Sequence, residues 1–253
     1  MQSINEVLSR LEQIIEQAKE QESPLGYFPA VYYNMTAAIR NGIAQGKFEN
    51  GSRMEQLDVR FAQRYFDAFD AWQAGKPASK SWQAAFEASK NNRLTVLQHI
   101  LLGINAHINL DLGIATAQTR SGDAVLGLKK DFDCVNDIIA SLTERVQEQL
   151  AAIWLPMTIV DYLLRSEDEG WINFSIRVAR GAAWKAATAL AFTRQHETET
   201  ALIQDLDTGV SMLAGRLVNP GFGARLGLRL MRRTEHGSVR EKIEALVLMN
   251  DER

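Results

Sequence analysis

Apolar residues recur along most of the chain at spacings of three and four, and clean alternation of apolar and polar residues is scarce. This spacing is typical of amphipathic helices. Long segments between the five prolines are rich in Ala, Leu, Gln, Glu and Arg, which are good helix formers. The sequence therefore predicts an all-α, multi-helix bundle, with helices near residues 3–20, 29–46, 52–75, 80–89, 92–119, 124–151, 156–165, 170–196, 199–216, 221–233 and 238–248.

Local signals indicate where several of these helices begin and end. Ser52 is followed three residues later by Glu55, which is the spacing of a capping box at a helix N-terminus. Gly75, just before a Lys-Pro pair, predicts a helix stop, and Gly170 marks another break. We therefore expect helix boundaries close to these three positions.

Composition narrows the class of protein. With 253 residues, 46% of them hydrophobic and 23% charged, the chain resembles an ordinary globular protein rather than a disordered one. A net charge of −3 is not expected of a protein that coats nucleic acid, so we predict no nucleic-acid partner. The single cysteine excludes an internal disulfide and a cysteine-based zinc cluster. The N-terminus shows no signal-peptide pattern, so we expect a cytoplasmic protein.

No long linker, internal repeat or low-complexity tract divides the chain. We therefore expect one all-α domain over residues 1–253, with a basic helical extension from about residue 216. Between Arg216 and Lys242 there are seven basic residues and two acidic ones, with leucines between the arginines. Two interpretations stay open: this segment binds an acidic membrane surface or partner as a peripheral protein, or it packs against the acidic remainder of the chain.

The segment LQHILLGINAHINLDLG, residues 97–113, is apolar around nearly its whole circumference. A helix of this kind is usually enclosed by others, so we predict that residues 92–119 form a buried central helix. Buried polar groups need hydrogen-bond partners. At about 100° per residue the polar side chains fall on two stripes. One stripe holds amides, which we interpret as clamps on neighbouring backbone, with Asn105 also a candidate ligand-binding residue. The other stripe holds His107 and Asp111. The six polar residues are Gln98, His99, Asn105, His107, Asn109 and Asp111.

His107 and Asp111 are one helical turn apart, so they can share a substrate or a metal, or bond one another. His99 is about 12 Å along the axis from His107, and we expect it in a different layer of the same cavity. Three interpretations stay open for this pair. It acts on a small or lipid-like ligand, or it only fixes helix register in a non-catalytic scaffold. In the third interpretation it holds one divalent metal (Zn or Fe) in a hydrolase or oxygenase-like site, completed by Asp58 or His99 from elsewhere in the fold. For an enzyme, hydrolysis is the least demanding chemistry, with His107 as general base and Asp111 orienting it.

A second polar stripe lies in GWINFSIRVARGAAWKAATAL, where Asn173, Arg177, Arg180 and Trp184 share one helix face. Arginines in line with an indole can stack on it or present a planar fork to a carboxylate or phosphate. One interpretation is an ion-pair ladder at the surface. The other is that Arg177 or Arg180 turns inward, to neutralise Asp111 or to hold an anionic ligand, and Arg180 would then stabilise negative charge in a reaction.

Five segments together resemble a bacterial family defined only as a domain of unknown function (domain of unknown function 5995): LDVRFAQRYFDAFDAW (57–72), SWQAAF (81–86), LQHILLGINAHINLDLGIA (97–115), DFDCVNDII (131–139) and RVARGAAW (177–184). The resemblance covers roughly residues 28–195 and is most specific in GINAHINLDL. It implies a compact helical domain and no particular activity. Carried over residue by residue, it points to Asp58, His99, His107, Asp111, Arg180 and Trp184.

Overall fold

The computed structural model describes residues 1–139 and 176–247, and all regular structure in these residues is helical. The all-α prediction is therefore confirmed. The predicted helix 156–165, and the parts of 124–151 and 170–196 between these ranges, lie outside the described residues. The α-helices are α1 (Ile4–Glu20), α2 (Tyr27–Ala44), α3 (Gly51–Gln73), α4 (Lys80–Ala88), α5 (Val96–Ala106), α6 (Leu112–Thr119), α10 (Ile176–Phe192), α11 (His196–Val218), α12 (Phe222–Thr234) and α13 (Val239–Val247). Residues 129–139 are also helical, and three short segments complete the described structure: η1 (Pro24–Gly26), η2 (His107–Asp111) and η3 (Gly122–Leu128).

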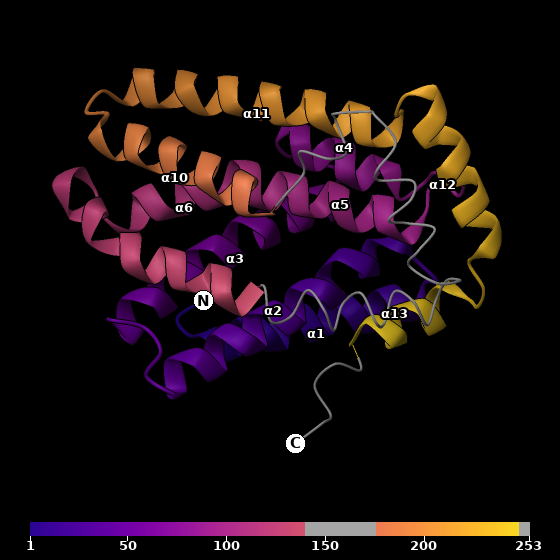
Figure 1. Ribbon diagram of the computed structural model, residues 1–253, viewed down its shortest axis with the longest axis horizontal. Helices are drawn as coiled ribbons and strands as arrows, with labels where there is room; N and C mark the ends of the chain where they lie inside the picture. The colour runs from indigo at the N-terminus through magenta and orange to yellow at the C-terminus, as the bar shows by residue number, and fades with distance from the viewer. Residues whose placement is uncertain (140–175, 248–253) are drawn as a thin grey trace.

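The helices are arranged around a central rod formed by α5, η2 and α6, which follow one another end to end (Figure 1). On one side α10 packs on α6, and α11 packs on α5 and α4. On the other side α2 and α3 contact the rod, α1 packs behind α2, and α13 returns to α2 and α1. The segment Val96–Thr119 is long and apolar enough to span a membrane, but 78% of its most apolar window is buried inside the protein. The prediction of a buried central helix is confirmed.

Two glycines allow neighbouring helices to approach the rod closely. A Cβ atom on Gly103 would lie 2.3 Å from the ring of Phe28 on α2. A Cβ atom on Gly113 would lie 3.1 Å from the backbone oxygen of Ala183 on α10. The absence of these side chains therefore brings α2 and α10 into direct contact with the central helix.

The rod begins at Val96 rather than near residue 92, because Thr95 is its N-cap. The Thr95 hydroxyl accepts from the backbone N–H of Gln98, and the Gln98 side chain accepts from the backbone N–H of Thr95. This reciprocal capping box satisfies two backbone groups that a helix N-terminus would otherwise leave unpaired.

The predicted cap of α3 is wrong. Asn50, not Ser52, accepts from the backbone N–H of Arg53 at 2.9 Å, so the helix begins two residues earlier. Glu55 is not engaged in a capping box, because its carboxylate accepts from the backbone N–H of Ile4 at the start of α1. At the other end the predicted stop is confirmed, since Gly75 has φ +66°, which favours glycine.

Candidate functional site

The central helix widens into one π-helical turn over His107–Asp111. The backbone N–H of Leu112 donates to the carbonyl of His107, five residues earlier rather than four. Within this turn Nδ1 of His107 lies 3.2 Å from Oδ2 of Asp111, and both side chains are buried. The predicted contact between the two residues is therefore present, and π turns occur frequently at functional sites.

The carboxylate of Asp111 binds donors from two other helices. Its Oδ1 accepts from Nε of Arg64 on α3 at 2.9 Å, and its Oδ2 accepts from Nε1 of Trp82 on α4 at 2.7 Å. Arg64 forms an ion pair with the buried carboxylate of Asp111, and the Arg64 side chain is itself partly exposed to solvent. The prediction that Arg177 or Arg180 neutralises Asp111 is wrong.

Aromatic rings enclose the imidazole of His107. The ring of Phe61 stacks on it at 3.5 Å between centroids, and Tyr32 meets it edge-on at 4.6 Å. Burial lowers the pKa of His107, although the hydrogen bond to Asp111 opposes this effect, so the ring is neutral at pH 7. Because a carboxylate only accepts, the proton lies on Nδ1, and Nε2 is a free acceptor. Nε2 has no hydrogen-bond partner within the described residues.

Asp58 is a second buried carboxyl group near this cluster. Neither of its oxygens has a hydrogen-bond partner in the described part of the chain. Burial raises its pKa to about 7, and the charge of Glu55 adds to the shift. A cavity of about 20 Å³, large enough for one water molecule, is lined by Asp58, Phe61 and Arg180. Asp58 and Arg180 therefore border the same small cavity, and Asp58 makes no direct bond to Asp111.

His99 lies apart from His107. Its ring packs on Tyr27 at 5.8 Å between centroids, and burial, assisted by the charge of Arg232, lowers its pKa to about 4. It lines another cavity of about 20 Å³ together with Tyr65 and Trp82. Neither of the two small cavities is lined by His107. His99 and His107 therefore do not line either small cavity together.

The amide stripe of the central helix clamps α11, as predicted. Nδ2 of Asn105 donates to the carbonyl of Val210 at 3.0 Å, and Nε2 of Gln98 donates to the carbonyl of Leu217 at 2.9 Å. Asn109 in turn donates to Oδ1 of Asn105. Asn105 was also a candidate ligand-binding residue, but both ends of its side chain are occupied by these bonds.

The described residues do not assemble a metal-binding set around His107 and Asp111. Within residues 1–139 and 176–247 no three His, Cys, Asp or Glu side chains are placed to hold a metal ion. Nδ1 of His107 faces Asp111, so only Nε2 is available as a ligand atom. Structural and catalytic zinc sites use at least three protein ligands.

A much larger cleft, of about 750 Å³, lies between residues 129–139 and α10. Basic residues in its wall outnumber acidic ones by five to two, and two aromatic rings contribute apolar surface. Arg177, Arg180 and Trp184 share one face of α10, as the polar stripe in the sequence predicts, and all three line the cleft. Asn173, the fourth residue of that stripe, lies outside the described residues. The remaining lining residues are Lys129, Lys130, Phe132, Asp133, Cys134, Asn136, Asp137, Gly181 and Lys185.

Arg180 is the buried cation of this cleft, with only 5% of its surface exposed. Its Nε donates to Oδ1 of Asn136 at 2.7 Å, and its Nη2 donates to the carbonyl of Phe132. The guanidinium also lies over the ring of Phe132, at 4.3 Å from the centroid. Burial lowers its pKa to about 10, against the opposing effect of Asp133, so it stays protonated at pH 7. It forms no ion pair with a carboxylate of the described residues.

Residues 4–220 match a family of unknown function, DUF5995. The chain belongs to this family. The match extends beyond the predicted range of residues 28–195 at both ends, taking in α1 and all of α11, whereas α12 and α13 lie outside it. No curated protein and no solved structure matches the chain.

In this DUF5995 member, sequence reasoning missed two partners of Asp111. Trp82 belongs to the segment SWQAAF, one of those that carry the resemblance to DUF5995, so a signal for it existed. Arg64 lies within LDVRFAQRYFDAFDAW, another of these segments. However, one arginine among several polar residues on a helix does not indicate that it pairs with a residue 47 positions away. The DUF5995 region therefore holds an enclosed polar cluster at His107 and, separately, an open basic cleft at Arg180.

Proposed function

We propose that the protein binds a small anion with an apolar body, such as a lipid-like carboxylate or phosphate, in the cleft between residues 129–139 and α10. The observation that carries the proposal is the buried guanidinium of Arg180, which lines the cleft and forms no direct ion pair with a carboxylate of the described residues, although Asp133 acts on it at longer range. A buried charge without a counter-ion is costly, and an anionic ligand would supply one.

The rest of the cleft supports the same class of ligand. Arg177 and Lys185 also line the cleft and are exposed, so the positive charge extends from the buried Arg180 toward the solvent. The rings of Phe132 and Trp184, with centroids 5.1 Å apart and planes inclined by 58°, contribute an apolar wall. A volume of about 750 Å³ falls within the range of pockets that hold drug-sized ligands. Guanidinium groups suit carboxylates and phosphates because their donors form a planar fork.

Gly181 provides a direct test of this proposal. A Cβ atom at Gly181 would meet nothing within 4 Å, so Gly181→Leu places a side chain into the cleft without disturbing the packing. Gly209 on α11 is equally open, and Gly209→Leu is the matched control. Decanoate and anilinonaphthalenesulfonate are titrated into each protein by calorimetry and fluorescence. We expect Gly181→Leu to weaken binding about tenfold, and the control to bind like the natural chain.

Two further measurements separate charge from shape. Arg177→Gln and Lys185→Gln should each weaken decanoate binding and leave decanol, which lacks the charge, unaffected. Cys134, the only cysteine of the chain, lines the cleft, so bound decanoate should slow its reaction with a maleimide. Failure of the natural chain to bind either probe, or equal binding by Gly181→Leu, would refute the proposal.

The hydrolytic role of His107 and Asp111 stays a prediction. The neutral imidazole with a free Nε2 in a π turn supports it. Its test is ester hydrolysis by the natural chain and by His107→Ala, compared with His236→Ala on an exposed turn. The scaffold alternative predicts instead that His107→Ala lowers the melting temperature and changes neither hydrolysis nor decanoate binding. The metal alternative lacks a third ligand among the described residues.

A further inference from the structure

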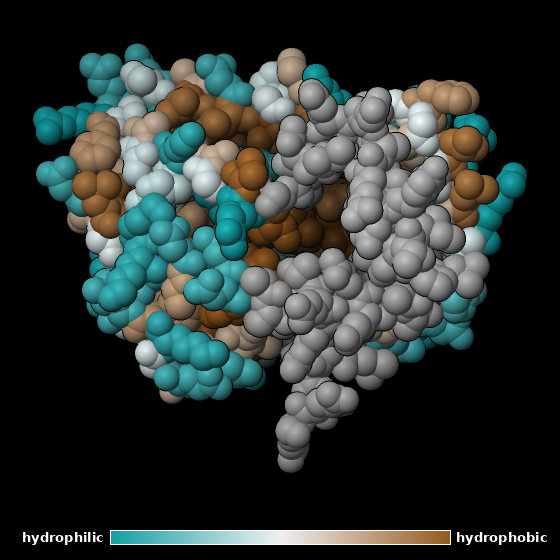
Figure 2. All heavy atoms as spheres, viewed as in Figure 1, coloured by the Kyte–Doolittle hydropathy of each residue, from teal (hydrophilic) through white to brown (hydrophobic). Residues whose placement is uncertain are grey.

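The helix α12 exposes an apolar stripe. Phe222, Leu226 and Leu230 are one turn apart from each other, and their exposed fractions are 87%, 52% and 50%. Side chains of this size are rarely left in water in a row unless the row is a contact surface. Figure 2 shows hydrophobic side chains next to hydrophilic ones along this end of the molecule.

An arginine stripe runs directly beside the apolar one. Arg225, Arg229 and Arg233 are also one turn apart and exposed. At about 100° per residue the centres of the two stripes are about 60° apart, so both belong to the same outward half of α12. None of the three guanidinium groups forms an ion pair with the residues that the structure describes; Arg225 donates to the carbonyl of Pro220. Their charge is therefore available to an external partner.

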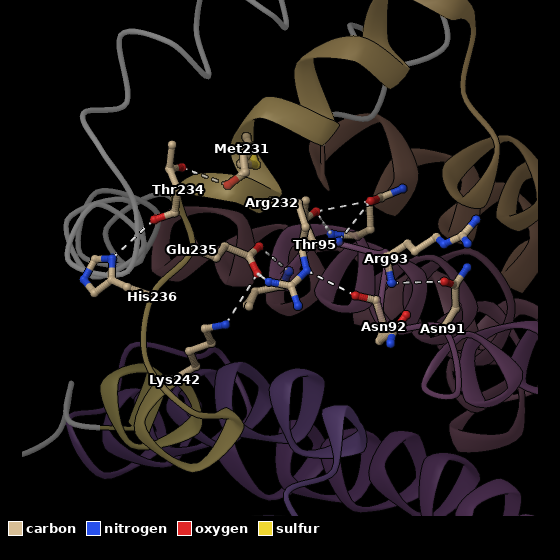
Figure 3. Close-up of polar contacts among 12 residues, drawn as sticks. Asn91, Asn92, Arg93, Thr95, Met231, Arg232, Thr234, Glu235, His236 and Lys242 are labelled. Carbon is tan, nitrogen blue, oxygen red and sulfur yellow. Dashed lines mark hydrogen bonds and ion pairs between the residues drawn. The ribbon is translucent and has the colours of Figure 1, made fainter.

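The opposite side of α12 is anchored to the protein. Met231 is buried against the core cluster that includes Val96 and Ile243. Beyond the helix C-terminus, the buried carboxylate of Glu235 accepts from the backbone N–H of Val96 at 2.8 Å. The same carboxylate pairs with Arg232 at 3.2 Å and Lys242 at 3.6 Å (Figure 3). These contacts anchor the inner side of α12 to the protein, so the two stripes face outward.

From this arrangement we infer that α12 lies flat on an anionic lipid surface. A bilayer surface presents phosphate groups and acyl chains within a few ångströms of depth, and a helix with adjacent basic and apolar stripes matches both at once. Phe222, Leu226 and Leu230 enter the acyl boundary, while Arg225, Arg229 and Arg233 bind the phosphates. An acidic protein would instead need a groove that follows both stripes of a single short helix.

This surface is independent of the proposed ligand cleft. It lies outside residues 4–220, so it is a feature of this chain rather than of the matched DUF5995 region. In Figure 1 α12 forms one end of the molecule, between α11 and α13, whereas the cleft lies between α10 and residues 129–139.

The experiment is sedimentation of the full chain with vesicles of phosphatidylcholine alone, or with about one-third phosphatidylglycerol. We expect binding to the anionic vesicles about fivefold above the neutral ones, and loss of that difference at high salt. The charge variant Arg225→Glu/Arg229→Glu/Arg233→Glu and the apolar variant Leu226→Ser/Leu230→Ser should each reduce the bound fraction to that of neutral vesicles. All five positions are exposed, so both variants should keep the helical circular dichroism of the natural chain.

Matched controls carry the same changes elsewhere. Arg60→Glu/Arg93→Glu/Arg194→Glu reverses the same number of exposed charges, and Leu126→Ser/Phe192→Ser removes apolar side chains that are 53% and 49% exposed. Both controls should bind anionic vesicles like the natural chain. Three results would overturn the inference: no binding to either vesicle, equal loss in the controls, or loss in Arg177→Gln rather than in the α12 variants. A dimer that the Leu226→Ser/Leu230→Ser variant dissociates, seen by light scattering, would assign the face to a second copy instead.

Discussion

The indole N–H of Trp82 donates to Oδ2 of Asp111 at 2.7 Å, and the same oxygen lies 3.2 Å from Nδ1 of His107. Because Arg64 binds the other oxygen, a single carboxylate joins the central helix to α3 and α4. Three polar contacts at one buried point can only form in one register of these helices. The cluster therefore specifies how the three helices pack.

Removal of Arg64 should destabilise the protein strongly. Arg64→Ala leaves the buried carboxyl group of Asp111 without its ion-pair partner, which we expect to lower the free energy of unfolding by about 3 kcal/mol. Arg60→Ala, on an exposed position of the same helix, is the control and should change stability by less than about 0.5 kcal/mol. Urea unfolding at pH 7 measures both. Equal effects from the two variants would show that Asp111 does not depend on Arg64.

Asp58 should make stability fall as pH rises. Its pKa is about 7 in the folded protein and near 3.8 in the unfolded chain, so the folded state binds the proton more tightly. Stability is therefore lost between about pH 4 and pH 7, because over this range the carboxyl is ionised in the unfolded chain and still protonated in the folded protein. Asp58→Asn should be more stable than the natural chain by about 2–4 kcal/mol at pH 8 and nearly equal to it at pH 4. Urea unfolding across this range tests the slope, and a constant difference between the two proteins would contradict it.

His99 should have the opposite effect. Its pKa is lowered from 6.5 to about 4 by burial and by Arg232, so the unfolded chain binds the proton more tightly. Stability is lost as pH falls from about 6.5 to about 4. His99→Phe should remove this part of the acid sensitivity, and His236→Phe, on an exposed turn, should not. Thermal melts at pH 7 and pH 4 make the comparison, and an unchanged acid sensitivity in His99→Phe would refute the assignment.

Glu235 should contribute to stability through the N-terminus of α5. Glu235→Gln keeps an acceptor for the backbone N–H of Val96 but removes the charge that pairs with Arg232 and the buried Lys242. We expect a loss of about 2 kcal/mol, because an ammonium group is left buried without a counter-ion and the helix dipole loses a nearby negative charge. The double variant Glu235→Gln/Lys242→Met should recover part of that loss. If Glu235→Gln alone melts like the natural chain, the ion pairs contribute nothing.

Local patterns predicted the helices and the contacts within one helix. The spacing of His107 and Asp111 placed them one turn apart, and the amide spacing predicted the clamps at Gln98 and Asn105, because helical geometry depends only on positions close in sequence. The residue that caps a helix was harder to predict from the sequence, because several residues near a helix start can accept from the first backbone N–H groups. At the start of α3 the cap is Asn50 rather than Ser52.

The amino-acid sequence by itself determined an all-α protein with a buried central helix, and it singled out the polar stripe of that helix and the arginine–tryptophan face of α10. Only the tertiary structure decided that Arg64 and Trp82 bind Asp111, and that Arg180 faces a cleft instead. These partners are 47 and 29 residues from Asp111 along the chain. Periodicity reports which side of a helix is buried, but the choice among many buried or half-buried partners depends on how whole helices pack, which no local pattern encodes.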